Sequence, residues 1–328
     1  MINNSDKHTN SSATIEDWHD FLQIPPVSRL VSNAISMSPE PSGMQTHYAT
    51  LYGDGKELAV RWSKSVGSPL IHGHPLVKII PRNLSILFDG GAVLIDQLEI
   101  LKSPLSFINI FSTALPSWFD NLELRDKAIV CWNWLDEKNR LLLNSLLHDD
   151  AFFKRFCEGP SSTSNHHAYR NGNLEHTIEV INIATLNCLH IHNANYQLAL
   201  IFAWLHDIGK ADEYQSSNSP DKQYKLTSTG YLHGHQMTGF YKLLEARTKY
   251  APEYPESTFN HLRHLMTARM SSDPLNYRNA QMIEYDLVQL ADILSAKGNL
   301  HSDAFCGLPF GKHPFLGNSK TPNFRYEL

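Results

Sequence analysis

The stretch LALIFAWLHDIGK, residues 198–210, decides how the second half of this chain folds. Its first part is an unbroken apolar run that is too short to span a bilayer. Four of its residues follow the i, i+3, i+4, i+7 spacing of one helix face: Leu198, Ile201, Phe202 and Leu205. The spacing predicts a buried helix that ends at an adjacent polar pair, His206 and Asp207.

This polar pair has the chemistry of a metal site. A divalent cation accepts an imidazole nitrogen together with a carboxylate oxygen. Neighbouring helix residues project about 100° apart, so both reach one ion only when it lies beside the helix end. Further ligands must then come from other helices. The candidates are His176, in the motif HHAYRNGNLEHT (166–177), and Asp292, in the apolar helical run QLADILSA (289–296), where an unpaired carboxylate would be costly to bury.

Each of these residues also has an ordinary explanation when it is taken alone. An adjacent His-Asp pair on a helix is commonly a surface feature, and a single histidine is commonly a hydrogen-bonded core residue. Asp292 could cap a helix or pair with Lys297. The four residues together, on separate predicted helices, favour a site for a divalent metal ion.

Composition narrows the class of protein. The chain has 328 residues, 18 histidines and a formal charge of −5, so no strong positive field indicates nucleic-acid binding. Its four cysteines form no C-x-x-C pair, which argues against a zinc ribbon or a redox dithiol. The N-terminus lacks the apolar core of a signal peptide. We therefore expect a cytoplasmic protein with no membrane partner.

The chain divides into segments that differ in composition and in the spacing of their apolar residues. Residues 1–42, rich in Ser, Asn and Pro, are expected to form a flexible N-terminal segment. Residues 43–105 carry short β-branched and aromatic runs between turn formers such as GDGK (53–56), which predicts a small barrel of OB-fold size. Helical spacing then predominates. We expect an α+β multidomain protein in which this OB-like β-barrel is followed by a linker at 106–130, an all-α domain at 131–298 and a tail at 299–328.

The order His, His-Asp, Asp and the string LHDIGK resemble the HD-domain superfamily of metal-dependent phosphohydrolases. The segment HHAYRNGNLEHT resembles more closely the HHAYxGGLLEHT segment of the YhaM-type 3′-to-5′ exoribonucleases, in which an OB-fold precedes an HD domain. The resemblance extends from about residue 43 to about residue 298, and its most specific parts are residues 166–177 and 205–210. The histidine-rich segment is also similar to that of H-class TraI-type relaxases, which lack the preceding barrel.

The resemblance implies roles for individual residues. His176, His206, Asp207 and Asp292 would bind one divalent metal ion, which could be Mn, Mg, Fe or Zn. His235 would bind a second ion with Asp207 as the bridge, and Lys210 would contact the substrate phosphate unless it is a solvated residue at a helix end.

One part of the chain departs from the family. An adjacent His-His pair expected before the last Asp is missing from HLRHLMTARMSS (261–272). His264 is then the most plausible helper for a partial second site. Arg269 stands near the missing pair, and its guanidinium could hold a phosphate bidentately in place of an ion. The alternative is that Arg269 points to solvent and the second site is lost.

The predicted barrel would bind single-stranded RNA or DNA in a groove. Its candidate contacts are Tyr48, Tyr52 and Trp62 for stacking and Lys56, Arg61 and Lys64 for phosphates, with His167 added from the histidine-rich segment. Tyr52 and Trp62 could equally be barrel core. Residues 43–105 hold six Lys and Arg against five Asp and Glu, so charge gives little support.

Three functions remain open at this point. The first is a metal-dependent nuclease that trims single strands from the 3′ end. The second is a conjugation protein of the TraI relaxase type, and the third is a catalytically weakened module that keeps one ion and binds nucleic acid. The sequence leaves open the preference for RNA or DNA, the metal, the number of ions, the oligomeric state and the pathway.

Overall fold

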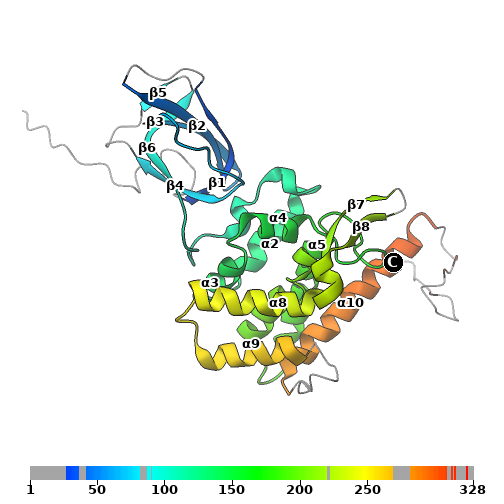
Figure 1. Cartoon of the computed structure of the whole chain (residues 1–328). Coiled ribbons are helices and arrows are strands. Elements are labelled where there is room, and N and C mark those ends of the chain that lie inside the picture. The colour runs from blue at the N-terminus through cyan, green and yellow to red at the C-terminus, as the bar shows by residue number, and fades with distance from the viewer. Residues whose placement is uncertain are drawn as a thin grey trace, which may run out of the picture. The chain divides into compact units, whose positions relative to one another are not determined.

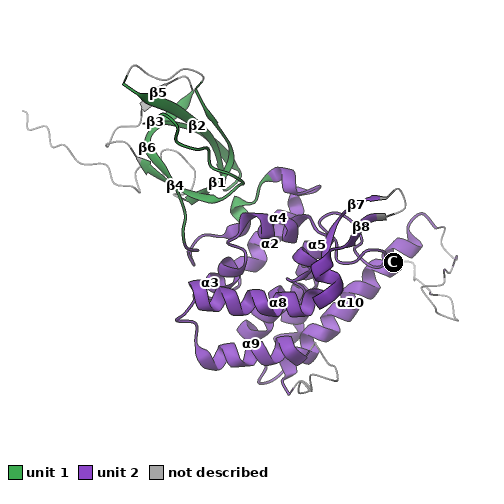
Figure 2. Cartoon of the chain, viewed as in Figure 1, with its two compact units in different colours: residues 1–102, 112–115 green, residues 103–111, 116–328 purple. Residues whose placement is uncertain are grey.

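The computed structural model describes residues 27–36, 42–81, 87–89, 91–219, 222–268 and 281–308, together with residues 312, 314 and 323. The chain forms two compact units (Figure 2), residues 1–102 with 112–115 and residues 103–111 with 116–328.

The first unit is a closed barrel (Figure 1). Its strands are β1 (Val27–Ile35), β2 (Met44–Gly53), β3 (Lys56–Ser65), β4 (Leu76–Pro81), β5 (Leu87–Asp89) and β6 (Ala92–Ile100). The strands pair in the order β3-β2-β1-β4-β6, and a parallel pairing of β3 with β6 closes the ring. The short β5 pairs only with β6 in a hairpin. This confirms the predicted OB-like barrel.

Turn chemistry and alternation explain the barrel. Asp54 and Gly55 have positive φ angles of 49° and 80°, so they form the tight turn that joins β2 to β3, as the sequence predicts. The inward positions form one apolar core that includes Leu51, Val60, Trp62, Val77 and Val93. Each of these five side chains is at most 2% exposed.

The predicted start of the barrel at residue 43 is too late, because β1 lies inside the segment that was expected to be flexible. This strand was missed because it carries a buried arginine. Arg29 is 1% exposed, and its guanidinium donates hydrogen bonds to the backbone carbonyls of His74 and Thr113 and to the hydroxyl of Thr113. These acceptors satisfy the buried charge and tie residues 112–115 to the barrel unit.

The second unit is built of helices and one small hairpin. Its elements are α2 (Leu122–Asn133), α3 (Glu137–Leu146), α4 (Asp150–Glu158), α5 (Gly172–Cys188), α6 (Tyr196–Leu205), α7 (Lys210–Glu213), β7 (Tyr214–Ser219), β8 (Lys222–Leu226), α8 (Ser228–Tyr250), α9 (Glu256–Ala268) and α10 (Ile283–Phe305). The helical part confirms the predicted fold class, and the β7–β8 hairpin is an addition to it. Within the described residues, helix α2 begins inside the expected linker, and α10 continues past the expected domain end at 298.

Helix α6 lies at the centre of the helical unit. Every residue from Leu198 to Leu205 is buried, so this helix is covered on all sides rather than along one stripe. The Phe111 ring stacks on Trp204 at a centroid distance of 5.0 Å and packs edge-on against Phe153 at 5.4 Å. Residues ahead of α2 therefore complete the core that holds α6. No helix in the described part of the chain is long and apolar enough to cross a membrane.

Candidate metal centre

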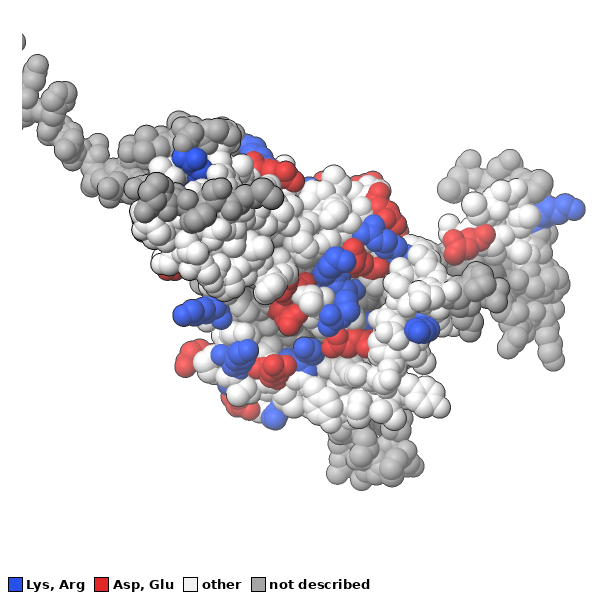
Figure 3. Space-filling view, turned by 45° about the horizontal axis from the view of Figure 1, so that its top comes forward, with Lys and Arg blue, Asp and Glu red and all other residues white. Residues whose placement is uncertain are grey.

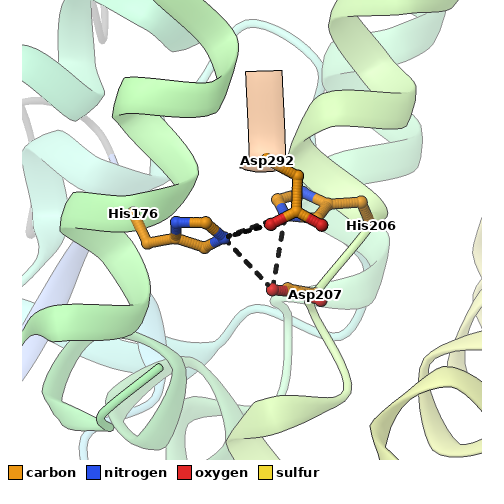
Figure 4. Close-up of side chains that lie close together, drawn as sticks. All are labelled: His176, His206, Asp207 and Asp292. Atoms are coloured by element: carbon orange, nitrogen blue, oxygen red, sulfur yellow. Dashed lines mark hydrogen bonds and ion pairs between the residues drawn. The ribbon is translucent and has the colours of Figure 1, made fainter. Parts of the chain in front are cut away.

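Four side chains from three parts of the helical unit converge in its interior (Figure 4). His176 comes from α5, His206 and Asp207 from the end of α6, and Asp292 from α10. One potential ligand atom from each residue lies within 4.8 Å of those of the other three. His176, His206 and Asp207 are at most 2% exposed, whereas the Asp292 side chain is 23% exposed. The structure thus brings together the four residues that the sequence selected.

The end of α6 presents the adjacent pair to one point. His206 is the last residue with a helical hydrogen bond, from its backbone N–H to the carbonyl of Phe202 at 2.8 Å. The chain then tightens into a turn in which the N–H of Lys210 donates to the carbonyl of Asp207 at 3.0 Å. This turn carries the Asp207 carboxylate beside the helix end, as the 100° projection of neighbouring residues requires.

Hydrogen bonds fix the tautomers of both histidines. The Nδ1 of His206 lies 2.7 Å from the carbonyl of Ala203, which can only accept, so Nδ1 carries the proton. The Nδ1 of His176 lies 2.8 Å from the Ser295 hydroxyl, which itself donates to Glu179 at 2.6 Å. Both Nε2 atoms therefore offer their lone pairs to the centre, which is the usual arrangement of metal-binding histidines.

The spacing of these atoms fits one ion. Two atoms that each lie about 2.1 Å from one ion, at angles of about 90–109°, are roughly 3.0–3.4 Å apart. The His176 Nε2 lies 3.1 Å from Asp292 Oδ1, 3.4 Å from Asp207 Oδ2 and 3.4 Å from His206 Nε2. The His206 Nε2 lies 3.3 Å from Asp207 Oδ2. Two imidazole nitrogens and two carboxylate oxygens at this spacing form a donor set for a divalent cation.

The electrostatics of the site keep the Asp207 carboxylate ionised. Its complete burial would by itself raise the pKa. The charge of Lys210 and the contacts with His206 and His176 outweigh burial, and they hold the pKa of Asp207 well below its usual range. A buried carboxylate that stays ionised is a strong ligand for a cation.

Lys210 is part of the site and is not the solvated helix-end residue of the alternative interpretation. Its side chain is 8% exposed. Its ammonium lies 2.6 Å from Asp207 Oδ2 and donates to the Ser161 hydroxyl at 2.9 Å. An ammonium has three N–H groups, and these two contacts use two of them. The third N–H can still donate to a phosphate oxygen.

Of the residues predicted for a second site, His235 lies close to Asp207, whereas His264 does not belong to the ligand group of the described residues. The His235 Nε2 lies 3.4 Å from Asp207 Oδ1, while its Nδ1 lies 2.8 Å from Glu213 Oε2. His264, on α9, is not a member of the ligand group found among the described residues, and its Nε2 accepts a hydrogen bond from the backbone of Gln281 at 3.2 Å. Arg269 lies outside the described residues.

Two histidines of the HHAY segment lie beside the four-residue group. The ring centroids of His166 and His176 are 5.5 Å apart. Burial, together with the charges of His176 and Lys210, lowers the pKa of His166 to about 4, so this imidazole is neutral. His167 is 0% exposed and its Nε2 lies 3.2 Å from Glu179 Oε2, so the prediction that it contacts nucleic acid is wrong. A side chain without exposed surface has no face to offer a base or a phosphate.

The barrel residues that were predicted to bind nucleic acid differ in how far their side chains are exposed. Tyr52 and Trp62 are each 2% exposed and belong to the interior, so the prediction that they stack on bases is wrong for both. The outward candidates are available: Tyr48 is 40% exposed, and it pairs across the strands with the half-buried Arg61. Lys56 is exposed and Lys64 is half-buried. On the face shown in Figure 3, the described basic residues are interspersed with acidic ones.

The residues that support the four-residue group were not predicted from the sequence. These are Ser161, which binds Lys210, Glu213, which binds His235, and the pair Glu179 and Ser295 behind His176. A spacing signal for the last two exists in the sequence. Glu179 follows His176 by three positions and Ser295 follows Asp292 by three positions, so each lies one helical turn after a ligand on the same face.

Divalent-ion binding is expected to weaken as the pH falls. Burial lowers the pKa of His176, but the contacts with Asp207 and Asp292 raise it more, and the result lies above the ordinary value. Since a protonated Nε2 cannot bind an ion, each pH unit below that raised pKa should reduce apparent affinity by about tenfold, and affinity should level off above it. Calorimetric titration with Mn²⁺ between about pH 5 and about pH 8 measures this. An affinity that stays constant across this range would exclude His176 as a ligand.

Residues 173–297 match the model of the HD domain, a range that contains the four converging residues. No curated protein matches the chain. The helical unit thus carries an HD domain, which supports the HD-domain superfamily of metal-dependent phosphohydrolases as the family of this part of the chain.

Proposed function

We propose that this protein is a metal-dependent phosphodiesterase that hydrolyses single-stranded nucleic acid from the 3′ end. The observation that carries the proposal is the buried group of His176, His206, Asp207 and Asp292 with Lys210 against it. The presence of an OB-like barrel in the same chain supports a nucleic acid as the substrate. The resemblance of HHAYRNGNLEHT to the YhaM-type exoribonucleases supports the 3′-to-5′ direction.

The chemistry proposed for the site divides between an ion and the side chains. His176, His206, Asp207 and Asp292 would hold a divalent ion, whose positive charge would polarise a phosphoryl oxygen and make water a better nucleophile. These residues lie in a largely buried place, where electrostatic interactions are stronger than in water. Lys210 keeps Asp207 ionised and offers its remaining N–H to a non-bridging phosphate oxygen. The His235 Nε2 lies 3.4 Å from Oδ1, the other oxygen of Asp207.

The class of substrate can be tested with small esters. The protein loaded with Mn²⁺ is expected to hydrolyse bis(p-nitrophenyl) phosphate, a diester, faster than p-nitrophenyl phosphate, a monoester. The same preparation should shorten single-stranded RNA or DNA. Hydrolysis of the monoester alone would contradict a nuclease and point to another activity of the superfamily.

The barrel is expected to affect long substrates only. Replacing Tyr48, Arg61 and Lys64 together by alanine removes one exposed ring and two partly exposed cations from strands β2 and β3. Because stacking on an aromatic ring contributes about 1–3 kcal/mol per base, KM for a long oligonucleotide should rise by about tenfold or more. Hydrolysis of bis(p-nitrophenyl) phosphate should not change.

Lys102→Ala is the matched control, because Lys102 is an exposed cation that follows β6 and is not a candidate contact. An unchanged KM for the long oligonucleotide in the triple variant would exclude the surface formed by these residues of β2 and β3 as the binding groove.

A metal-containing binding module is the second candidate. The observation that favours it is His264, whose Nε2 is engaged by the backbone of Gln281 and which is not in the ligand group of the described residues. One ion per chain with no hydrolysis of any diester would establish this module in place of a nuclease.

A further inference from the structure

We infer that Glu179 and Ser295 form a relay that positions the metal ligand His176, with Glu179 acting through Ser295 and not on the substrate. This inference rests on the proposed metal centre and adds two residues that control it. Neither residue is among the ligands, and both lie on the far side of the His176 ring from the site.

The contacts run in one line. The His176 Nδ1 lies 2.8 Å from Ser295 Oγ, and Ser295 Oγ lies 2.6 Å from Glu179 Oε2. His176 and Ser295 are at most 3% exposed, so water does not replace either partner. The His176 and Glu179 side chains come from α5 and that of Ser295 from α10, so the relay also joins the two helices that supply His176 and Asp292.

The number of hydrogens sets the direction of the relay. An ionised carboxylate accepts hydrogen bonds and donates none, and a serine hydroxyl has a single proton. The Ser295 proton therefore goes to Glu179, and the hydroxyl oxygen must accept from His176 Nδ1–H. The tautomer with a bare Nε2 is then the only one that satisfies all three groups, and that nitrogen lies 3.1 Å from Asp292 Oδ1.

The two histidines of the site differ in what holds their Nδ1 atoms. The Nδ1 of His206 is held by the backbone carbonyl of Ala203, which is an acceptor in any variant. His176 depends on two side chains for the same constraint. A change at Ser295 or Glu179 should therefore loosen one imidazole and leave the other unaltered.

His167 contacts Glu179, the member of the relay that reaches the surface. Its Nε2 lies 3.2 Å from the same Glu179 oxygen that accepts from Ser295. The backbone of His167 is fixed by Asn299, whose Oδ1 accepts from its N–H at 2.8 Å. Its carbonyl faces Gly172, where an added Cβ would come within 2.1 Å of the oxygen. This buried imidazole therefore lies against the Glu179 carboxylate, whose side chain is 41% exposed.

Matched controls are available in the groove where the relay reaches the surface. This groove lies between α5 and α10, and Glu175, Glu179, Ser295 and Ser302 all line it. Glu175 lies one turn before Glu179 on α5, and Ser302 lies two turns after Ser295 on α10. Neither Glu175 nor Ser302 takes part in the relay contacts.

The test is a calorimetric titration of the full chain with Mn²⁺. Supporting partners of metal-binding histidines typically contribute about 10–100-fold to metal affinity, so Ser295→Ala and Glu179→Ala should each weaken binding by about that factor. Glu179→Gln keeps an oxygen that accepts from Ser295, and it should restore affinity to within about threefold of wild type. The controls Glu175→Ala and Ser302→Ala should bind Mn²⁺ like wild type.

Hydrolysis of bis(p-nitrophenyl) phosphate distinguishes an effect on ion binding from an effect on the reaction itself. At saturating Mn²⁺ the relay variants should recover nearly wild-type kcat, since the relay acts on ion binding. Wild-type Mn²⁺ affinity in both Ser295→Ala and Glu179→Ala would overturn the relay. If Ser295→Ala does not fold, the partly exposed Glu179 gives the decisive variant. Loss of affinity in these variants in a protein that hydrolyses no diester would support the relay and contradict the proposed phosphodiesterase.

Discussion

Asp207→Asn is expected to remove the bound ion and to lower kcat/KM for bis(p-nitrophenyl) phosphate by about a thousandfold or more, because metal assistance supplies several kcal/mol to such a reaction. Both oxygens of Asp207 are in use, Oδ2 against His176, His206 and Lys210 and Oδ1 against His235. Asparagine keeps the shape of the side chain and removes its charge. The metal content of the purified variant is the direct measurement.

Asp212→Asn is the control for this change. Asp212 lies on α7, close to Asp207 in the chain, but its carboxylate pairs with Arg155 at 2.6 Å and not with the ligand group. We expect this variant to keep its ion and its activity. A variant lacking the Asp207 carboxylate that retains one ion per chain and wild-type turnover would show that the site is elsewhere.

Gly209→Ala is expected to have the largest effect on stability. A Cβ at this position would come within 1.9 Å of the His235 carbonyl oxygen and 2.6 Å of the backbone nitrogen of Gly239. Both neighbours are backbone atoms of α8, so the helix has to move away as a body. Overpacking of this kind costs about 1–3 kcal/mol of unfolding free energy, and occasionally more. The shift would also carry His235 away from Asp207.

Chemical denaturation of the metal-free proteins measures this effect. Gly298→Ala is the control, because Gly298 lies within α10 and an added Cβ there meets nothing within 4 Å. It should leave stability unchanged or raise it by about 0.4–1 kcal/mol, since alanine is the better helix former. If Gly209→Ala were as stable as wild type, the close packing of the LHDIGK turn against α8 would be wrong.

The four-residue group was largely predictable from the sequence, and the reason is physical. Its members are polar residues placed in or at the ends of apolar helical runs, where burial without a partner would be costly. His206 and Asp207 follow the fully buried helix α6, and Asp292 interrupts the apolar run of α10. Periodicity and chemistry therefore pointed to the same residues.

Other features needed three-dimensional contacts. The burial of Arg29 in β1 depends on carbonyl acceptors at His74 and Thr113, which are far away in the chain. The exposure of the barrel aromatics depends on strand register: Tyr48 faces outward while Trp62 lies in the core. The contact of His167 with Glu179 likewise depends on the left-handed backbone at His167, which has a φ of 48°. None of these is determined by local spacing.

We propose that the four-residue group hydrolyses phosphodiesters at the 3′ end of single strands. The most direct measurement follows a single-stranded oligonucleotide labelled at its 5′ end, incubated with the protein and Mn²⁺. We expect a ladder of labelled products that shortens one nucleotide at a time and disappears in Asp207→Asn. Release of a labelled mononucleotide from the 5′ end, or an intact strand with protein that holds a full complement of ion, would contradict it.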